Sequence, residues 1–255
     1  MSFKNKVVLV TGASSGIGAA IALKFAEEGA SVAIVGRNED KLKKVTENIA
    51  KVGNKPLVVV ADMTKDNDVQ RIVNDTLKQF GKIDVLVNNA GVSRYTDITD
   101  ENAMKEYDNV INTNLRSVVY LTHLASKYII ESKGNIINIS SVAGKIVWKN
   151  GFAYCTSKAG LDHFSRAIAL DLAPKGVRVN TINPGPVMTD IFEAMGFKGE
   201  AQTALLDGVI KMTALKRISD PAEIAELALF LASDKAVGIT GSTYVTDNGF
   251  MLGGN

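Results

Sequence analysis

Tyr154 and Lys158 stand four residues apart, and Ser141 precedes Tyr154 by thirteen residues. If residues 152–173 form a helix, Tyr154 and Lys158 leave the same face of it. A phenol, whose ordinary pKa is ~10, exchanges a proton near neutrality only when something stabilises its phenolate. An ammonium group one helical turn away can do so, and a serine hydroxyl can hold a carbonyl or alcohol oxygen. These three groups predict proton transfer at an oxygen, as a hydride-transfer reaction requires.

A glycine-rich segment at residues 11–18 follows the first apolar run and precedes a helical pattern. Its spacing, Gly-x-x-x-Gly-x-Gly, differs from the commoner Gly-x-Gly-x-x-Gly fingerprint. Such glycines let backbone N–H groups approach a pyrophosphate, although glycine-rich strand–helix turns also occur for steric reasons alone. The position after the first strand favours a nucleotide site. The predicted contacts here are Gly12, Ser14, Ser15, Gly16, Ile17 and Gly18.

The second apolar run ends in Gly36, Arg37 and Asn38. An acidic residue at this point would bind both ribose hydroxyls and repel a 2′-phosphate. Gly36 supplies no carboxylate, whereas the Arg37 guanidinium suits a phosphate. The pattern favours NADP(H) over NAD(H), with Asn38 as a neighbouring contact. The alternative is that Arg37 is a solvated arginine at a helix start.

The third apolar run is followed by Asp62 and Met63, which we expect beside the adenine. Asp62 could accept a hydrogen bond from the adenine amino group. An ordinary carboxylate at the end of a strand is an equally good interpretation.

Short runs rich in β-branched residues alternate with longer segments of helical spacing. The runs suit strands buried on both faces of a parallel sheet, at 7–10, 32–35, 57–60, 85–87, 136–139, 177–182 and 243–245. The helical segments are 19–28, 39–50, 69–80, 103–131 and 153–173. This alternation predicts an α/β fold with a doubly wound, mostly parallel, seven-stranded Rossmann-like sheet and helices on both faces.

We expect one dinucleotide-binding catalytic domain over residues 1–255. Residues 188–215 carry scattered Met, Phe and Leu between glycines, which predicts a mobile substrate lid with two short helices. Regular structure restarts at Asp220-Pro221-Ala222-Glu223, where the pattern predicts a capping box.

Composition narrows the class of protein. Lys and Arg total 29 against 27 Asp and Glu, so no basic field would attract nucleic acid. One cysteine, Cys155, excludes an internal disulfide and suggests a reducing compartment, hence a cytoplasmic location. The two histidines are far apart in sequence and lack nearby thiols to complete a zinc site, so we expect no metal. No apolar stretch is long enough to predict a transmembrane helix.

Together these residues resemble the short-chain dehydrogenase/reductase family in its compact single-domain branch, similar to 3-oxoacyl-carrier reductases and small carbonyl reductases. The motifs that carry the resemblance are 11–18, Asp62, 88–91, Asn114, Ser141, Tyr154, Lys158, 184–185 and Thr189. The resemblance implies that Asn114, Ser141, Tyr154 and Lys158 are catalytic, with Asn114 holding a water in a proton relay to Lys158. The spacing to Tyr154 selects Ser141 rather than Ser140.

The resemblance also implies further cofactor contacts and an assembly. The contacts beyond the glycine loop are Asn89, Ala90, Gly91, Tyr154, Lys158, Pro184, Gly185, Val187 and Thr189. It implies a homotetramer in which the helices around 103–131 and 153–173 pack across a two-fold axis. Lys158, with the positive ring of an oxidised cofactor, is expected to lower the pKa of Tyr154.

The predicted function is an NADP(H)-dependent oxidoreductase that interconverts a carbonyl and an alcohol, on a lipophilic 3-oxoacyl, isoprenoid or steroid-like substrate. The alternative is a catalytically silent NADP(H)-sensing protein; a sugar-nucleotide epimerase fits less well. Residues that could line a substrate cavity, or simply pack in the core, are Tyr95, Trp148, Phe152, Met188, Phe192 and Met195. Cys155 and His123 are interpreted as structural, and Asp162 and His163 as surface or subunit-contact residues.

Overall fold

The computed structural model describes residues 2–189 and 199–253. Within them seven strands form one parallel sheet in the order β3-β2-β1-β4-β5-β6-β7, which confirms the predicted fold class. The order reverses between β1 and β4, so a crevice opens there at the carboxyl ends of the strands. The strands are β1 Val7–Thr11, β2 Ser31–Gly36, β3 Leu57–Val60, β4 Val85–Asn88, β5 Asn135–Ile139, β6 Arg178–Pro184 and β7 Thr243–Thr246.

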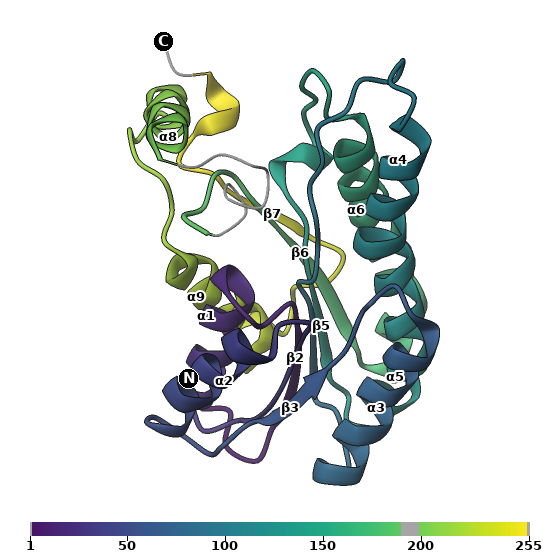
Figure 1. The fold of residues 1–255 in the computed structure, drawn as a ribbon. Helices are drawn as coiled ribbons and strands as arrows, with labels where there is room; N and C mark the ends of the chain where they lie inside the picture. The colour runs from purple at the N-terminus through teal and green to yellow at the C-terminus, as the bar shows by residue number, and fades with distance from the viewer. Residues whose placement is uncertain (1, 190–198, 254–255) are drawn as a thin grey trace.

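Helices cover both faces of the sheet (Figure 1). On one face lie α1 Gly16–Glu27, α2 Glu39–Ala50 and α9 Pro221–Ala232. On the other lie α3 Asp66–Phe80, α4 Ala103–Ile111, α5 Ser117–Glu131 and α6 Phe152–Leu172. A further helix, α8 Glu200–Met212, stands beyond the end of the sheet.

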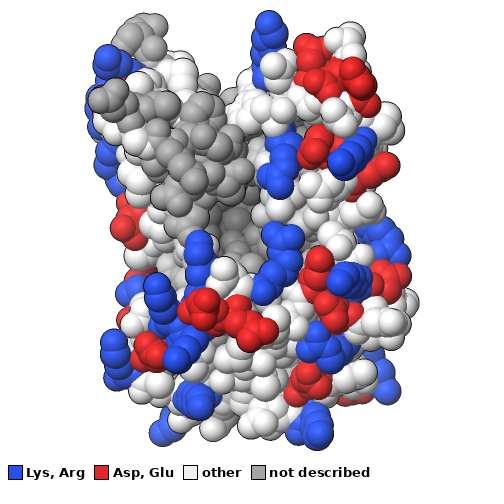
Figure 2. Space-filling view, viewed as in Figure 1, with Lys and Arg blue, Asp and Glu red and all other residues white. Residues whose placement is uncertain are grey.

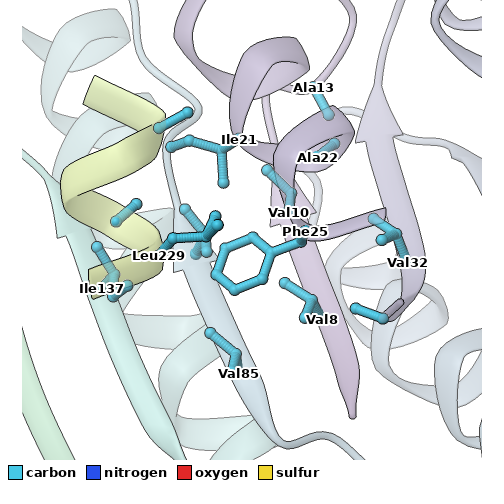
Figure 3. Close-up of a cluster of buried hydrophobic side chains, with 14 of the residues drawn as sticks. Val8, Val10, Ala13, Ile21, Ala22, Phe25, Val32, Val85, Ile137 and Leu229 are labelled. Atoms are coloured by element: carbon cyan, nitrogen blue, oxygen red, sulfur yellow. The ribbon is translucent and has the colours of Figure 1, made fainter. Parts of the chain in front are cut away.

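Alternating side chains of each strand build two separate hydrophobic cores. On β1, Val8 and Val10 enter the core under α1 and α9, while Leu9 enters the core under α3 and α5. Phe25 of α1 lies in the middle of the first core, between the strands and Leu229 of α9 (Figure 3). All five of these side chains are almost completely buried, which explains why the strand sequence shows no polar face.

The predicted helix over 103–131 is confirmed, and its helical backbone continues from α4 into α5 through one π-helical turn. A π-helical turn, η1 Asn112–Arg116, separates α4 from α5 and contains Asn114. A π-turn inserts one extra residue into the ladder and often marks a functional position. Here it turns the buried Asn114 side chain toward the β4–α4 connection.

The segment that precedes α9 is only partly described. Of the two short helices predicted in the lid, one is α8, and residues 190–198, with Phe192 and Met195, lie outside the described residues. The predicted capping box of α9 is confirmed: Asp220 accepts from the Ala222 N–H at 2.8 Å, and Glu223 accepts from the Asp220 N–H at 2.9 Å. None of the described helices is both long and apolar enough to cross a membrane.

Candidate active site

Helix α6 brings Tyr154 and Lys158 together at the carboxyl end of the sheet. The Lys158 ammonium lies 5.7 Å from the centre of the Tyr154 ring and donates a hydrogen bond to the Ile139 carbonyl at 2.9 Å. Ile139 is the last residue of β5. Strand β5 therefore fixes the lysine, and the helical spacing of four residues fixes the phenol beside it.

Ser141 lies where β5 leads into a 3₁₀ turn, η2 Val142–Gly144. Its hydroxyl accepts a hydrogen bond from the Ala143 N–H at 3.1 Å and also interacts with the Tyr154 hydroxyl. The neighbouring Ser140 hydroxyl instead donates to the backbone carbonyl of Lys158 at 3.2 Å. The two serines therefore have different partners, and Ser141 is the one that contacts the phenol.

The protein alone makes Tyr154 a weaker acid and Lys158 a weaker base. Burial raises the pKa of Tyr154 to about 12, although the hydrogen bond with Ser141 acts in the opposite direction. Burial lowers the pKa of Lys158 to about 8, against the charge of Asp162, which raises it. Lys158 by itself therefore does not lower the pKa of Tyr154. Burial destabilises the phenolate more than the partly desolvated ammonium stabilises it. Without a further positive charge, Tyr154 is a proton donor.

Asn114 uses its whole side-chain amide inside the protein. It accepts from the Val92 N–H at 2.8 Å, and its NH₂ group donates to the Val92 carbonyl at 2.8 Å and the Ser157 hydroxyl at 3.1 Å. Its side-chain oxygen also lies close to Gly91, whose Cα faces the Lys158 ammonium. The side chain thus ties the β4–α4 connection to α6, and the water-holding role implied by the family resemblance stays a prediction.

The glycine loop has the shape that a dinucleotide requires. Gly12 has φ +64°, and a Cβ there would lie 2.8 Å from the Ala90 Cα. A side chain at Gly16 would meet Thr189 at 2.9 Å, so the loop and the segment after β6 lie side by side. The loop opens α1, whose N-terminal dipole favours an anion. These cramped backbone positions fit a pyrophosphate that lies directly on the N–H groups.

A cleft of about 440 Å³ joins the glycine loop to helix α6 at Tyr154 and Lys158. Figure 2 shows the hollow in this face of the molecule, with Lys and Arg side chains on both sides of it. The predicted site residues that line it are Gly12, Ser14, Ser15, Gly16, Ile17, Arg37, Asn38, Asp62, Met63, Asn89, Ala90, Gly91, Tyr154, Lys158 and Thr189. Residues scattered over 178 positions of the chain thus converge on one cleft.

Several predicted residues do not line this cleft. Gly18 is packed against the Gly12 carbonyl, Asn114 is buried, and Ser141 is largely buried. Gly185 packs on Asp247, and Val187 pairs with Ser219. Pro184, the last residue of β6, is also absent from the lining.

Two basic residues of the cleft escaped the sequence analysis. Lys41 follows Arg37 by four residues, one turn into α2, and this spacing could have identified it. Arg94 lies on the other wall, with its Nε 3.5 Å from a Glu106 carboxylate oxygen. No local pattern marks Arg94, because only the fold brings the β4–α4 connection to the cofactor cleft.

Asp62 takes part in a local turn. Its carboxylate accepts from the Thr64 N–H at 3.0 Å and from the Thr64 hydroxyl at 2.8 Å. Burial would raise its pKa, but these bonds and the charges of Arg37 and Lys65 hold the pKa of the carboxyl below its usual range. The ionised carboxylate therefore attracts the Arg37 guanidinium, and a bond to adenine stays a prediction.

A second cavity, of about 470 Å³, lies beside the catalytic helix and is lined by Trp148 and Phe152. The Trp148 ring is 6.1 Å from the Tyr154 ring, and Phe152 stacks on Tyr107 at 6.2 Å. Tyr95 and Met188, predicted with them, do not line this cavity and are about half exposed. Trp148 thus forms an apolar wall next to the phenol.

The interpretation of Asp162 as a surface or subunit-contact residue is wrong. Asp162 is 3% exposed, and the Asn183 amide donates to its carboxylate at 2.8 Å. The helical period that exposes His163 turns the preceding residue toward the sheet. Cys155 is buried, as expected of a packed thiol. Among the described residues, no cluster of three or more His, Cys, Asp or Glu side chains could hold a metal ion.

Comparisons with known proteins agree with this geometry. Residues 12–251 match a family model described as enoyl-(acyl carrier protein) reductase. The chain is 35% identical to a 3-oxoacyl-[acyl-carrier-protein] reductase of Staphylococcus epidermidis, covering 97% of this chain and 100% of that protein. It is 37% identical to a glucose 1-dehydrogenase of Gluconobacter oxydans, covering 99% and 94%.

Solved structures of similar proteins have the same fold as this chain. A short-chain dehydrogenase/reductase of Caenorhabditis elegans, crystallised with cofactor, superposes with a TM-score of 0.93 at 36% identity, covering 98% of this chain and 96% of that one. Levodione reductase gives a TM-score of 0.92 at 30% identity, covering 97% and 98%. The chain therefore belongs to the short-chain dehydrogenase/reductase family, whose members are nicotinamide-dependent oxidoreductases of alcohol and carbonyl groups.

Proposed function

We propose that this protein is an NADP(H)-dependent reductase or dehydrogenase that interconverts a carbonyl and an alcohol on a lipophilic substrate. The observation that carries the proposal is one cleft shared by Tyr154, Lys158, the glycine loop and Arg37. A proton donor and a dinucleotide cradle in the same cleft match the two halves of a carbonyl reduction.

In the reductive direction, a nicotinamide cofactor held by the residues of this cleft would provide the hydride for the carbonyl carbon. Tyr154 donates its phenolic proton to the developing alkoxide, in keeping with its raised pKa in the protein alone. The Ser141 hydroxyl hydrogen-bonds the same oxygen and stabilises its charge. Lys158, held by the Ile139 carbonyl, binds the ribose and stabilises the phenolate that remains. General acid catalysis of this kind accelerates a reaction by roughly 10²–10⁴-fold.

The preference for NADP(H) rests on charge at the end of β2. Gly36 offers no carboxylate to a ribose 2′-hydroxyl, while Arg37, Asn38 and Lys41 line the cleft there. A 2′-phosphate beside the Arg37 and Lys41 cations would gain charge-assisted hydrogen bonds. NAD(H) would lack that contact, so we propose it as the weaker cofactor.

The lipophilic substrate is inferred from the apolar side chains near the phenol. Trp148 lies against Tyr154, and the half-exposed Tyr95 lies close enough to Tyr154 to affect its pKa. The reductase of Staphylococcus epidermidis is named for a 3-oxoacyl substrate, whereas the relative in Gluconobacter oxydans is named for glucose. The apolar surroundings favour 3-oxoacyl, isoprenoid or steroid-like compounds over sugars.

A homotetramer in the cytoplasm completes the proposal. The exposed side chains of Met104 on α4, Val119 on α5 and Leu170 on α6 support a subunit interface.

The test is a substrate panel followed at 340 nm with NADPH and with NADH, using acyl, isoprenoid, steroid and sugar carbonyls. We expect turnover with a lipophilic ketone and NADPH, reduced at least about 100-fold in Tyr154→Phe with NADPH binding retained. Tyr128→Phe on α5 is the matched control and should behave as wild type. NADPH binding without turnover of any compound would instead establish the silent cofactor-sensing protein.

A further inference from the structure

Asp162 continues the catalytic face of α6, one turn after Lys158 and two turns after Tyr154. Unlike those two it does not line the cofactor cleft, because it is buried between α6 and the end of β6. A carboxylate with 3% of its surface exposed is costly to keep charged unless nearby groups compensate. Among the described residues no ion pair to Asp162 within 4.0 Å occurs.

The partner of Asp162 is the side-chain amide of Asn183, which is fully buried on β6. The Asn183 NH₂ group donates to the Asp162 carboxylate at 2.8 Å and to the backbone carbonyl of Ser141 at 2.8 Å. Two acceptors on one side fix the orientation of this amide, because only its nitrogen can donate to both. The Asn183 side chain thus joins strand β6 to helix α6 and to the backbone of Ser141.

The backbone around this junction is shaped to admit the carboxylate. A Cβ on Gly144 would lie 2.7 Å from an Asp162 carboxylate oxygen and 3.1 Å from the Lys158 carbonyl oxygen. Only glycine therefore lets η2 approach α6 so closely. The contact sets the position of the turn that begins at Ser141.

We propose that Asp162 is a positioning residue for the reaction: through Asn183 it fixes Ser141 against Tyr154, and it places a carboxylate one helical turn along α6 from Lys158. This inference rests on the proposed roles of Tyr154, Ser141 and Lys158. Asp162 raises the pKa of Lys158, and it is the only ionic group in the described part of the chain that does so appreciably. Around the neighbouring phenol, Cys155 and Tyr95 act on Tyr154 instead.

The effect of the Asp162 charge on Lys158 is tested with Asp162→Asn. This variant removes the charge but keeps an oxygen that can accept from the Asn183 amide. The titration of Lys158 is followed by NMR on protein labelled with ¹³C at the lysine ε-carbons, and its signal is assigned with Lys158→Arg. We expect the Lys158 midpoint to fall by about one pH unit, a tenfold change in proton affinity. Ser165→Ala is the matched control, because Ser165 is also buried on α6 but bonds Asn138. If Asp162→Asn does not fold, Asp162→Ser provides the same test.

The link that the Asn183 amide makes between Asp162 and Ser141 is tested with Asn183→Ala. The measured quantities are kcat and KM with NADPH and the best ketone. We expect kcat to fall about tenfold while KM for NADPH changes less than about twofold, because the Ser141 hydroxyl loses its alignment and the cleft does not. A folded Asn183→Ala with wild-type kcat, or a Lys158 titration unchanged in Asp162→Asn, would overturn the inference. The NMR titration needs no turnover, so its result is independent of whether Tyr154→Phe supports the proposed function.

Discussion

The Lys158 ammonium is bound to the Ile139 carbonyl at 2.9 Å and lies 5.7 Å from the centre of the Tyr154 ring. This pairing places a cation in a site that is 4% exposed, and burial lowers its pKa to about 8. The same burial that brings the ammonium to the phenol therefore makes the ammonium costly. Lys158 therefore lowers the stability of the fold at neutral pH while it provides the charge that the phenolate needs.

Lys158→Met should abolish activity and increase stability at neutral pH. The pKa of Lys158 is about 8 in the folded state against 10.5 ordinarily, so the unfolded chain binds more protons between these values. Its burial costs about 3 kcal/mol below pH 8, and this cost disappears as the pH rises toward 10.5. With about 1 kcal/mol lost from the Ile139 hydrogen bond, we expect a net gain of about 2 kcal/mol.

Urea unfolding of wild type and Lys158→Met at pH 7 and pH 10 measures this difference. The advantage of the variant should shrink at the higher pH. Lys43→Met, on the exposed face of α2, is the control and should show no such trend. A Lys158→Met protein that is less stable than wild type at pH 7 would contradict the prediction.

Arg37→Ala should change the choice of cofactor. A hydrogen bond to a charged group contributes about 1.5–3 kcal/mol, so kcat/KM for NADPH should fall about 10- to 100-fold. The value for NADH should change less than about threefold, because no 2′-phosphate is involved. Steady-state kinetics with both cofactors measure the ratio, with Lys44→Ala as an exposed basic control on α2. Equal losses with NADPH and NADH would show that Arg37 does not read the 2′-phosphate.

The sheet could be predicted because its signal is local. Each of the buried strands is a short β-branched run, and the glycine loop follows the first of them directly. The capping box at Asp220 and Glu223 is likewise contained within four residues. The α6 face was predictable for the same reason, since Tyr154 and Lys158 are one helical turn apart.

What could not be predicted depends on partners far along the chain. The π-turn at Asn114 exists where its amide meets Val92, 22 residues earlier. Asp162 is buried because Asn183 meets it from β6, 21 residues later. The burial that raises the pKa of Tyr154 in the protein alone could not be predicted either, because desolvation depends on the packed cleft rather than on the spacing to Lys158.

Asn114→Ala should be both unstable and slow. It leaves the part-buried N–H and carbonyl of Val92 without their partners, at about 1–2 kcal/mol each. We expect the free energy of unfolding to fall by about 2–4 kcal/mol and kcat to fall at least about tenfold, because the β4–α4 connection loosens beside Lys158. Denaturant unfolding and steady-state kinetics measure the two effects.

Ser126→Ala is the control for Asn114→Ala, since its hydroxyl bonds only within α5. Asn114→Asp can still accept from the Val92 N–H but cannot donate to the carbonyl, so it should lie between wild type and Asn114→Ala in stability. Wild-type stability in Asn114→Ala would show that water replaces the amide at no cost.

Glu223→Gln should weaken the start of α9 in a pH-dependent way. A hydrogen-bonded ion pair with Arg217 at 2.6 Å, and the bond from the Asp220 N–H, lower the pKa of Glu223 to about 2. The contribution of this carboxylate is therefore complete above about pH 4.5 and is lost as the pH falls toward 2. Because the side chain is 37% exposed, we expect a loss of only about 1 kcal/mol at pH 7.

Helix α9 packs on α1, where Lys24 pairs with Glu226 at 3.0 Å, so the cap supports the helix that opens at the glycine loop. Thermal unfolding of wild type and Glu223→Gln from pH 7 to pH 2.5 should show Tm values that converge as the pH falls. Glu47→Gln, exposed on α2, should leave the wild-type profile intact. A difference that stays constant to pH 2.5 would mean that the charge of Glu223 contributes nothing, because only its ionised form is lost over that range.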